Sequence, residues 1–113
     1  MSYKIAIAST DGKVVNEHFG KADKFYIIEV DDKSTYQLIE VRKVIPLCED
    51  GGHKDFNMKD SINRLLDCKC IVVSRIGETV ENEFRRKNIN VFEISDLISE
   101  AILKVISFME KKN

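Results

Sequence analysis

The sequence predicts an α/β fold, a five-stranded mixed sheet with helices on both faces. Short strand-like runs recur along the chain, and in its second half they alternate with segments of helical periodicity. A turn cluster at 31–34 joins two early strands into a hairpin. The order strand, strand, strand, helix, strand, helix, strand, helix gives an antiparallel start followed by right-handed parallel units. We therefore expect the second strand to run antiparallel to the other four.

The first half of the chain contains three predicted strands. Residues 3–9 alternate larger side chains with smaller ones, and the alanines Ala6 and Ala8 leave room for a closely packed helix. Residues 24–30 and 36–44 are rich in β-branched and aromatic side chains, which favour strands. Together they predict the hairpin.

A helix and a buried strand follow. Four apolar residues fall on one helical face and predict a helix of about three turns. These residues are Met58, Ile62, Leu65 and Leu66. Residues 70–73 form a short continuous apolar run, typical of a strand covered on both faces. We interpret Cys68 and Cys70, at the start of this strand and on the edge away from its carboxyl end, as small buried hydrophobes.

The last three predicted elements are a helix, a strand and a helix. The first helix opens at Gly77, and its apolar residues recur at a spacing of four: Ile76, Val80 and Phe84. Residues 89–92 form the strand. Ser95 is the predicted N-cap of the final helix, whose apolar positions follow the helical period: Leu97, Ile98, Ala101, Ile102, Val105, Ile106 and Met109.

Length, charge and cysteine usage restrict the function. The 113 residues fit one domain, 1–113. With 18 basic and 19 acidic residues, no global field attracts nucleic acid or an anionic membrane. The chain opens without a signal-peptide pattern and has no apolar stretch of membrane-spanning length, which favours the cytoplasm. Three cysteines, an odd number, favour reduced thiols over a disulfide framework.

The predicted topology brings three loops to one edge of the sheet. The first, third and fourth strands point the same way, so their carboxyl ends share an edge, which is the usual ligand crevice of open α/β sheets. The loops there are 9–23, 45–56 and 74–78. They carry the candidate site residues His18, Cys48, His53, Arg75 and Gly77.

These side chains suit an anionic metal-sulfur species. Neutral imidazole and thiolate bind iron and other transition metals, so His18, Cys48 and His53 are candidate metal ligands, although each histidine alone could be a surface residue. The spacing from Cys48 to His53 is not that of a zinc finger, which argues against a closed structural site. Arg75 and the helix start at Gly77 could hold an anion, or form an ordinary strand-to-helix loop.

Three segments in order carry a resemblance to a known family. They are Asp11-Gly12 with His18-Phe19-Gly20, then Gly51-Gly52-His53, then residues 70–78. In these the chain resembles the dinitrogenase iron-molybdenum cofactor biosynthesis family, which includes NifX-type accessory proteins and the C-terminal domain of NifB. The resemblance extends over nearly the whole chain. One departure is Arg75, which stands where some members have a small residue.

The resemblance implies an RNase H-like fold and a function. Members bind the iron-molybdenum cofactor or its iron-sulfur precursor and pass it on during nitrogenase maturation. By this analogy His18 is the first candidate ligand, followed by Cys48 and His53, and the partners are metallocluster donor and acceptor proteins. Without a radical-chemistry domain and its cysteine triad, the chain is expected to be a non-enzymatic carrier.

Two other function classes stay open at this point. A regulatory or protein-interaction domain could use the same edge without metal. An RNase H-like magnesium-dependent nuclease would need several convergent carboxylates. Asp11 is the only acid near the end of the first strand, so we rank the nuclease last.

Overall fold

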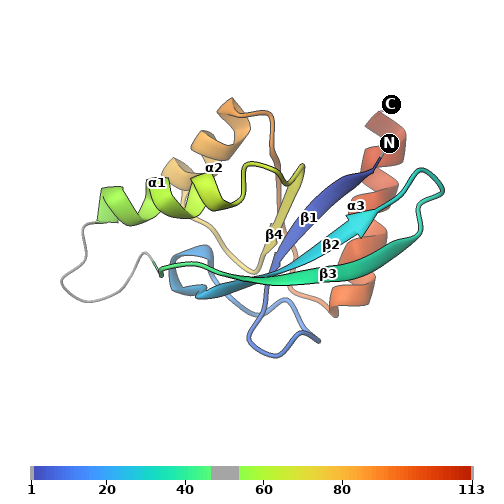
Figure 1. Cartoon of the computed structure of the whole chain (residues 1–113), viewed down its shortest axis with the longest axis horizontal. Helices are drawn as coiled ribbons and strands as arrows, with labels where there is room; N and C mark the ends of the chain where they lie inside the picture. The colour runs from blue at the N-terminus through green and yellow to red at the C-terminus, as the bar shows by residue number, and fades with distance from the viewer. Residues whose placement is uncertain (1, 47–53, 113) are drawn as a thin grey trace.

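A computed structural model describes residues 2–46 and 54–112, so the predicted ligands Cys48 and His53 lie outside the described residues. The order of the elements follows the prediction (Figure 1). They are β1 (Tyr3–Ala8), the 3-10 turn η1 (Phe19–Lys21), β2 (Lys24–Val30), β3 (Tyr36–Lys43), α1 (Lys54–Arg64), β4 (Cys70–Val73), α2 (Glu78–Arg86), β5 (Asn90–Glu93) and α3 (Ile98–Lys112).

The five strands form one mixed sheet in the order β3-β2-β1-β4-β5. The strand β2 pairs antiparallel with both β1 and β3, whereas β1 and β4, and β4 and β5, pair in parallel. The predicted direction of every strand is therefore confirmed. The ladder between β2 and β3 contains an irregularity at Ile27 and Ile28, which leaves Ile39 of β3 without an opposite residue.

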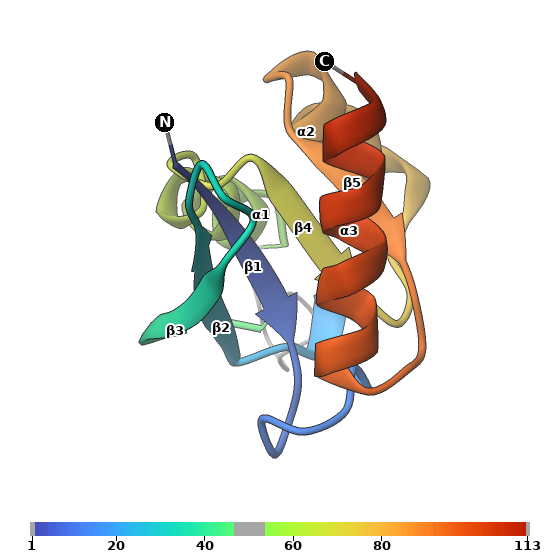
Figure 2. The ribbon, with the colours of Figure 1, turned by 90° about the vertical axis from the view of Figure 1, so that its right-hand side faces the viewer.

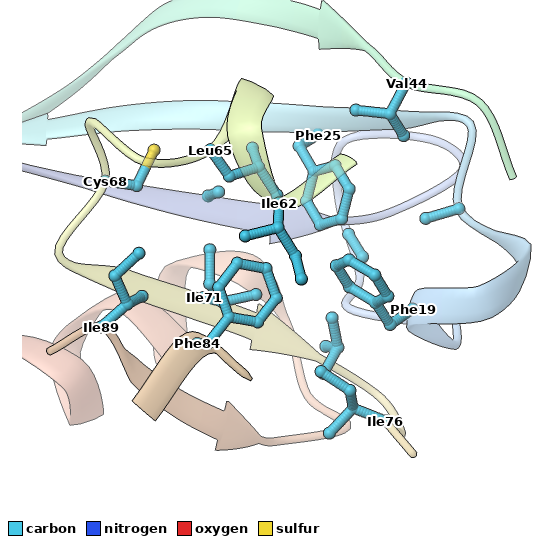
Figure 3. Packing of buried hydrophobic residues seen from close by; sticks show 14 of the residues in the cluster. Phe19, Phe25, Val44, Ile62, Leu65, Cys68, Ile71, Ile76, Phe84 and Ile89 are labelled. Atoms are coloured by element: carbon cyan, nitrogen blue, oxygen red, sulfur yellow. The ribbon is translucent and has the colours of Figure 1, made fainter. Parts of the chain in front are cut away.

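Helices α1 and α2 cover one face of the sheet. Phe84 of α2 and Ile62 of α1 are almost fully buried and lie close together (Figure 3). They belong to one hydrophobic cluster with the small side chains of Ala6 and Ala8 in β1. The predicted small-residue face of the first strand thus admits close helices. Phe19 completes this core, with its ring centroid 5.7 Å from that of Phe25 and 5.5 Å from that of Phe84.

Helix α3 crosses the opposite face, which makes three layers (Figure 2). Its buried residues Ala101, Ile102 and Val105 pack against Ile5, Ile7 and other side chains of the central strands. In both ribbon views the two chain ends lie at the end of the molecule opposite the loop that follows β1. Among the described residues no helix is long and apolar enough to cross a membrane.

Two details of the predicted helices are wrong. Helix α1 ends at Arg64, so Leu65 is buried from the following turn and Leu66 is exposed, because the apolar run continues past the helix end. Ser95 is not the N-cap of α3, which begins at Ile98. The preceding residues instead bond to the loop after β1, and they leave Leu97 exposed.

The interpretation of the two cysteines is confirmed. Cys68 and Cys70 are buried at the start of β4, away from the carboxyl edge. Burial raises the pKa of the Cys68 thiol to about 12, with a smaller contribution from neighbouring Asp67. Cys68 is therefore a poor thiolate ligand or nucleophile.

Candidate functional site

The loop after β1 is ordered by its own polar groups. The buried Ser9 hydroxyl accepts hydrogen bonds from the Asp11 and Gly12 amides at 3.3 and 3.0 Å. The Asp11 carboxylate accepts from the Lys13 and Val14 amides at 2.9 and 3.2 Å, and these bonds lower its pKa. Gly12 has a φ of +77°, a left-handed conformation that glycine adopts without strain, so the chain turns here.

Phe19 anchors the end of this loop in the core. Its ring is 3% exposed and packs between Phe25 and Phe84, while the residue before it, His18, is exposed. His18 is also the N-cap residue of the turn η1, and its backbone is extended there. Its carbonyl accepts a hydrogen bond from the Lys21 amide at 3.0 Å. The order His-Phe-Gly thus places an apolar anchor directly beside an imidazole at the surface.

A backbone bridge joins His18 to Arg75, as the topology predicted. The Phe19 amide donates to the Arg75 carbonyl at 2.8 Å, and the Ser74 amide donates to the Glu17 carbonyl at 3.0 Å. His18 and Arg75 are paired in a parallel bridge, so their side chains leave neighbouring positions on the same side. Both are exposed, and neither side chain has a hydrogen-bond or ion-pair partner among the described residues.

A third loop, which was not among those predicted from the sequence, lies at the same edge. The Val15 amide donates to the Asp96 carbonyl at 2.8 Å, and the Ile98 amide donates to the Lys13 carbonyl at 2.9 Å. The available signal was that β5 is also parallel to β1, so its carboxyl end shares the edge. We call the loops 9–23, 74–77 and 94–97 the rim.

Polar groups also cross the rim between the last two loops. The Ser74 and Ser95 hydroxyls are 3.1 Å apart, and Glu93 accepts the Ile76 amide at 3.1 Å. These contacts fix the strand-to-helix turn that carries Arg75. They also place one carboxylate near the start of α2.

Gly77 leaves the start of α2 open. It is the N-cap residue, with φ −71° and ψ 150°, and a Cβ built on it would meet no atom of the described residues within 4 Å. The amides of the first helical turn lack intrahelical acceptors, and no side chain of the described residues caps them. Within the described part of the chain, the exposed surface beside Arg75 therefore contains amide donors without a protein acceptor.

The structure brings together three of the five predicted site residues. His18 and Arg75 meet through the bridge, and Gly77 follows two residues later. Cys48 and His53 lie outside the described residues. The Val44 amide, just after β3, donates to the Asp23 carbonyl at 2.9 Å, so the carboxyl end of β3 lies beside the loop 9–23. In the described part of the chain, no three His, Cys, Asp or Glu side chains are grouped to hold a metal ion.

The sequence matches a known family and several of its proteins. Residues 1–107 match the family described as dinitrogenase iron-molybdenum cofactor. The FeMo cofactor biosynthesis protein NifB of Chlorobaculum tepidum is 29% identical over 110 residues, which are 96% of this chain and 25% of that protein. NifB of Frankia alni is 30% identical over 104 residues, 89% of this chain and 20% of that protein. The chain thus spans a quarter or less of these two curated relatives.

Solved structures share the fold. The crystal structure of PH0822 superposes with a TM-score of 0.66 at 22% identity, and covers 92% of this chain and 90% of its own. The crystal structure of MJ0327 from Methanocaldococcus jannaschii has a TM-score of 0.60 at 19% identity. The match covers 95% of this chain and 90% of the MJ0327 chain. Because the family match extends over almost the entire sequence, the chain belongs to the dinitrogenase iron-molybdenum cofactor family.

Proposed function

We propose that this chain is a non-enzymatic carrier of an iron-molybdenum or iron-sulfur precursor cluster in metallocluster biosynthesis. The observation that carries the proposal is the pair His18 and Arg75, held side by side at an exposed rim without partners among the described residues. Family membership supports the same cargo. In this proposal the protein acts in the cytoplasm, and the RNase H-like designation of its architecture stays a prediction.

The two side chains supply complementary chemistry to such a cargo. Neutral imidazole is a ligand for iron, and a guanidinium donates charge-assisted hydrogen bonds to the sulfides or carboxylates of an anionic cluster. The open start of α2 adds amide donors to the same surface. His18 is the proposed metal ligand, Arg75 and Gly77 are proposed contacts, and Cys48 and His53 remain further proposed ligands outside the described residues.

An exposed site with few ligands suits transfer. A carrier must release its cargo to an acceptor, which a closed four-ligand site would oppose. The bridge fixes the backbone of His18 and Arg75 but leaves both side chains free to exchange partners. We therefore propose cluster donor and acceptor proteins as the partners.

The first test is anaerobic loading of the wild type and of His18→Ala with iron and sulfide, or with isolated iron-molybdenum cofactor. Second-sphere changes at metal sites cost about 10 to 100-fold in affinity, so removing a ligand should weaken cluster binding at least about tenfold. Metal content and visible absorption measure the loss. The fold should persist, because His18 is exposed and only its backbone is bonded.

Matched variants complete the experiment. Lys21→Ala alters another exposed residue of the same turn and should load like the wild type. Arg75→Lys should retain more binding than Arg75→Ala, since it keeps the charge. Unchanged metal content in His18→Ala would refute the ligand role. A wild type that binds no cluster would favour the metal-free interaction domain, and magnesium-dependent hydrolysis of RNA would favour the nuclease.

A further inference from the structure

Strand β3 is an edge strand with an unusually apolar surface. Among the described strands it pairs only with β2, and seven of its eight residues are exposed. Four of them are large and apolar, with exposed fractions from 37 to 54%: Tyr36, Leu38, Ile39 and Val41. Natural proteins usually protect a free edge strand with charges, prolines, bulges or a covering segment, because an apolar edge strand is a template for pairing with another chain.

The apolar surface continues onto the neighbouring face of the sheet. Helix α3 crosses the central strands (Figure 2). A groove of about 480 Å³ lies between this helix and the strands β2 and β3. Tyr26, Leu38 and Ile102 are among the residues that line it. The edge of β3 is thus part of a larger exposed apolar region.

The backbone of β3 can accept a new strand at its carboxyl half. The Val44 amide is directed at Asp23, on the β2 side. Because backbone groups alternate along an antiparallel strand, those of Lys43 and Val41 point away from β2. These outward N–H and C=O groups are the ones that a sixth strand would bond.

We propose that β3 pairs antiparallel with β3 of a second copy of this chain, about a two-fold axis at Val41. A two-fold interface must be self-complementary, since each contact occurs twice. Within each chain the Arg42 guanidinium already donates to the Glu40 carboxylate at 3.0 Å and to the Asp67 carboxylate at 2.8 Å. With the axis at Val41 this pair meets its inverted copy, so that Glu40 faces Arg42 of the partner subunit and Arg42 faces the partner's Glu40. These would be non-hydrogen-bonded positions, where side chains are closest.

Charge selects this register over its neighbours. If the axis passed through Glu40, the two Glu40 carboxylates would face each other. If it passed through Arg42, the two Arg42 guanidinium groups would face each other. Like charges directly opposite each other destabilise a sheet. The formal net charge of −1 adds little repulsion between copies.

The proposed dimer is weak and concentration-dependent, because one strand pair buries less surface than a standard interface. Sedimentation equilibrium or light scattering from micromolar to sub-millimolar protein should show the mass rising from 13.0 kDa towards twice that value. The variant Val41→Lys would place two lysine ammonium groups opposite each other at the two-fold axis. It should therefore keep the measured mass at that of the monomer. Val41 is 49% exposed, so the fold should tolerate the change, which circular dichroism would verify.

Two further variants separate this interface from other modes of association. Asn82→Lys adds the same charge on exposed α2 and should dimerise like the wild type. In a Cys48→Ser background, Val41→Cys should form an intermolecular disulfide on mild oxidation, since hydrogen-bonded partners lie about 5.5 Å apart between Cα atoms. Asn82→Cys should not form one.

Three results would overturn the proposal. The first is a wild-type mass that stays at 13.0 kDa over the whole concentration range. The second is a dimer that survives Val41→Lys. The third is a dimer whose Val41→Cys variant fails to cross-link, which would place the contact elsewhere.

Discussion

The two rim glycines Gly12 and Gly77 differ in whether the backbone requires a glycine at that position. Gly12 has a φ of +77°, and a Cβ there would lie 3.0 Å from the Tyr26 ring. Gly77 has an ordinary extended conformation and open space beside it. Gly12 is therefore required by the backbone, whereas the structure of the described chain does not require a glycine at position 77.

Substitution should separate these two roles. Gly12→Ala should lower the free energy of unfolding by about 1 to 3 kcal/mol, the cost of a left-handed non-glycine residue, with the tyrosine contact added. Gly77→Ser offers an N-cap hydroxyl and should change stability by only a few tenths of a kcal/mol, roughly the difference between these caps. Urea denaturation measures both. Equal losses in the two variants would contradict the assignment.

At the scale of elements, Arg42 ties the edge strand to α1 and to the turn before β4. Its guanidinium donates to the Arg64 carbonyl at 2.6 Å and to the Asp67 carboxylate at 2.8 and 3.1 Å. Lys4 of β1 also donates to Asp67, at 3.1 Å. The hydrogen bonds from Arg42, with the smaller effect of Lys4, hold the pKa of Asp67 well below its usual value of 3.8.

This cluster predicts a pH-dependent contribution to stability. A carboxyl group whose pKa is lowered by folding stabilises the protein fully above its unfolded pKa, and the contribution is lost as pH falls below that value. Asp67→Asn should therefore cost about 1 kcal/mol or less at pH 7, since the pair is partly exposed. The difference from the wild type should narrow as the pH falls from about 5 through 3.8. Urea denaturation at pH 7 and pH 3 measures it, and a constant difference would contradict the prediction.

Periodicity predicted which elements exist better than where they end. The spacing of Ile76, Val80 and Phe84 identified the buried face of α2 because a regular helix repeats its contacts. Leu66 was assigned to a helical face although α1 had already ended. The start of α3 was placed too early because the Asp96 carbonyl and the Ile98 amide bond to the distant loop after β1, which no local pattern reveals.

At the scale of the whole molecule, connection rules predicted more than local patterns did. A hairpin followed by right-handed crossovers leaves few arrangements, and the direction of each strand followed from them. That topology placed His18 beside Arg75 although they are far apart in the sequence. The contribution of residues 94–97 to the rim was missed because it depends on backbone hydrogen bonds between loops, which leave no composition signal.

These bonds predict a rigid rim. Four amides, those of Val15, Phe19, Ser74 and Ile98, donate to carbonyls of a neighbouring rim loop at 2.8 to 3.0 Å. Opening any one of them requires a separation of segments that are anchored on both faces of the sheet by Phe19 and Ile98. Unlike most loop amides, they should exchange with solvent as slowly as strands do.

Native-state hydrogen exchange followed by NMR tests this expectation. The four amides should exchange within about tenfold of the rates of β1 amides, whereas Glu78 and Thr79, in the first turn of α2 and without intrahelical acceptors, should exchange fast. His18→Ala should leave this pattern unchanged, because only the imidazole is removed. Fast exchange of Phe19 and Ser74 in the wild type would show that the bridge opens readily. The rim would then hold His18 and Arg75 in no fixed relation, and a cargo would have to order the site as it binds.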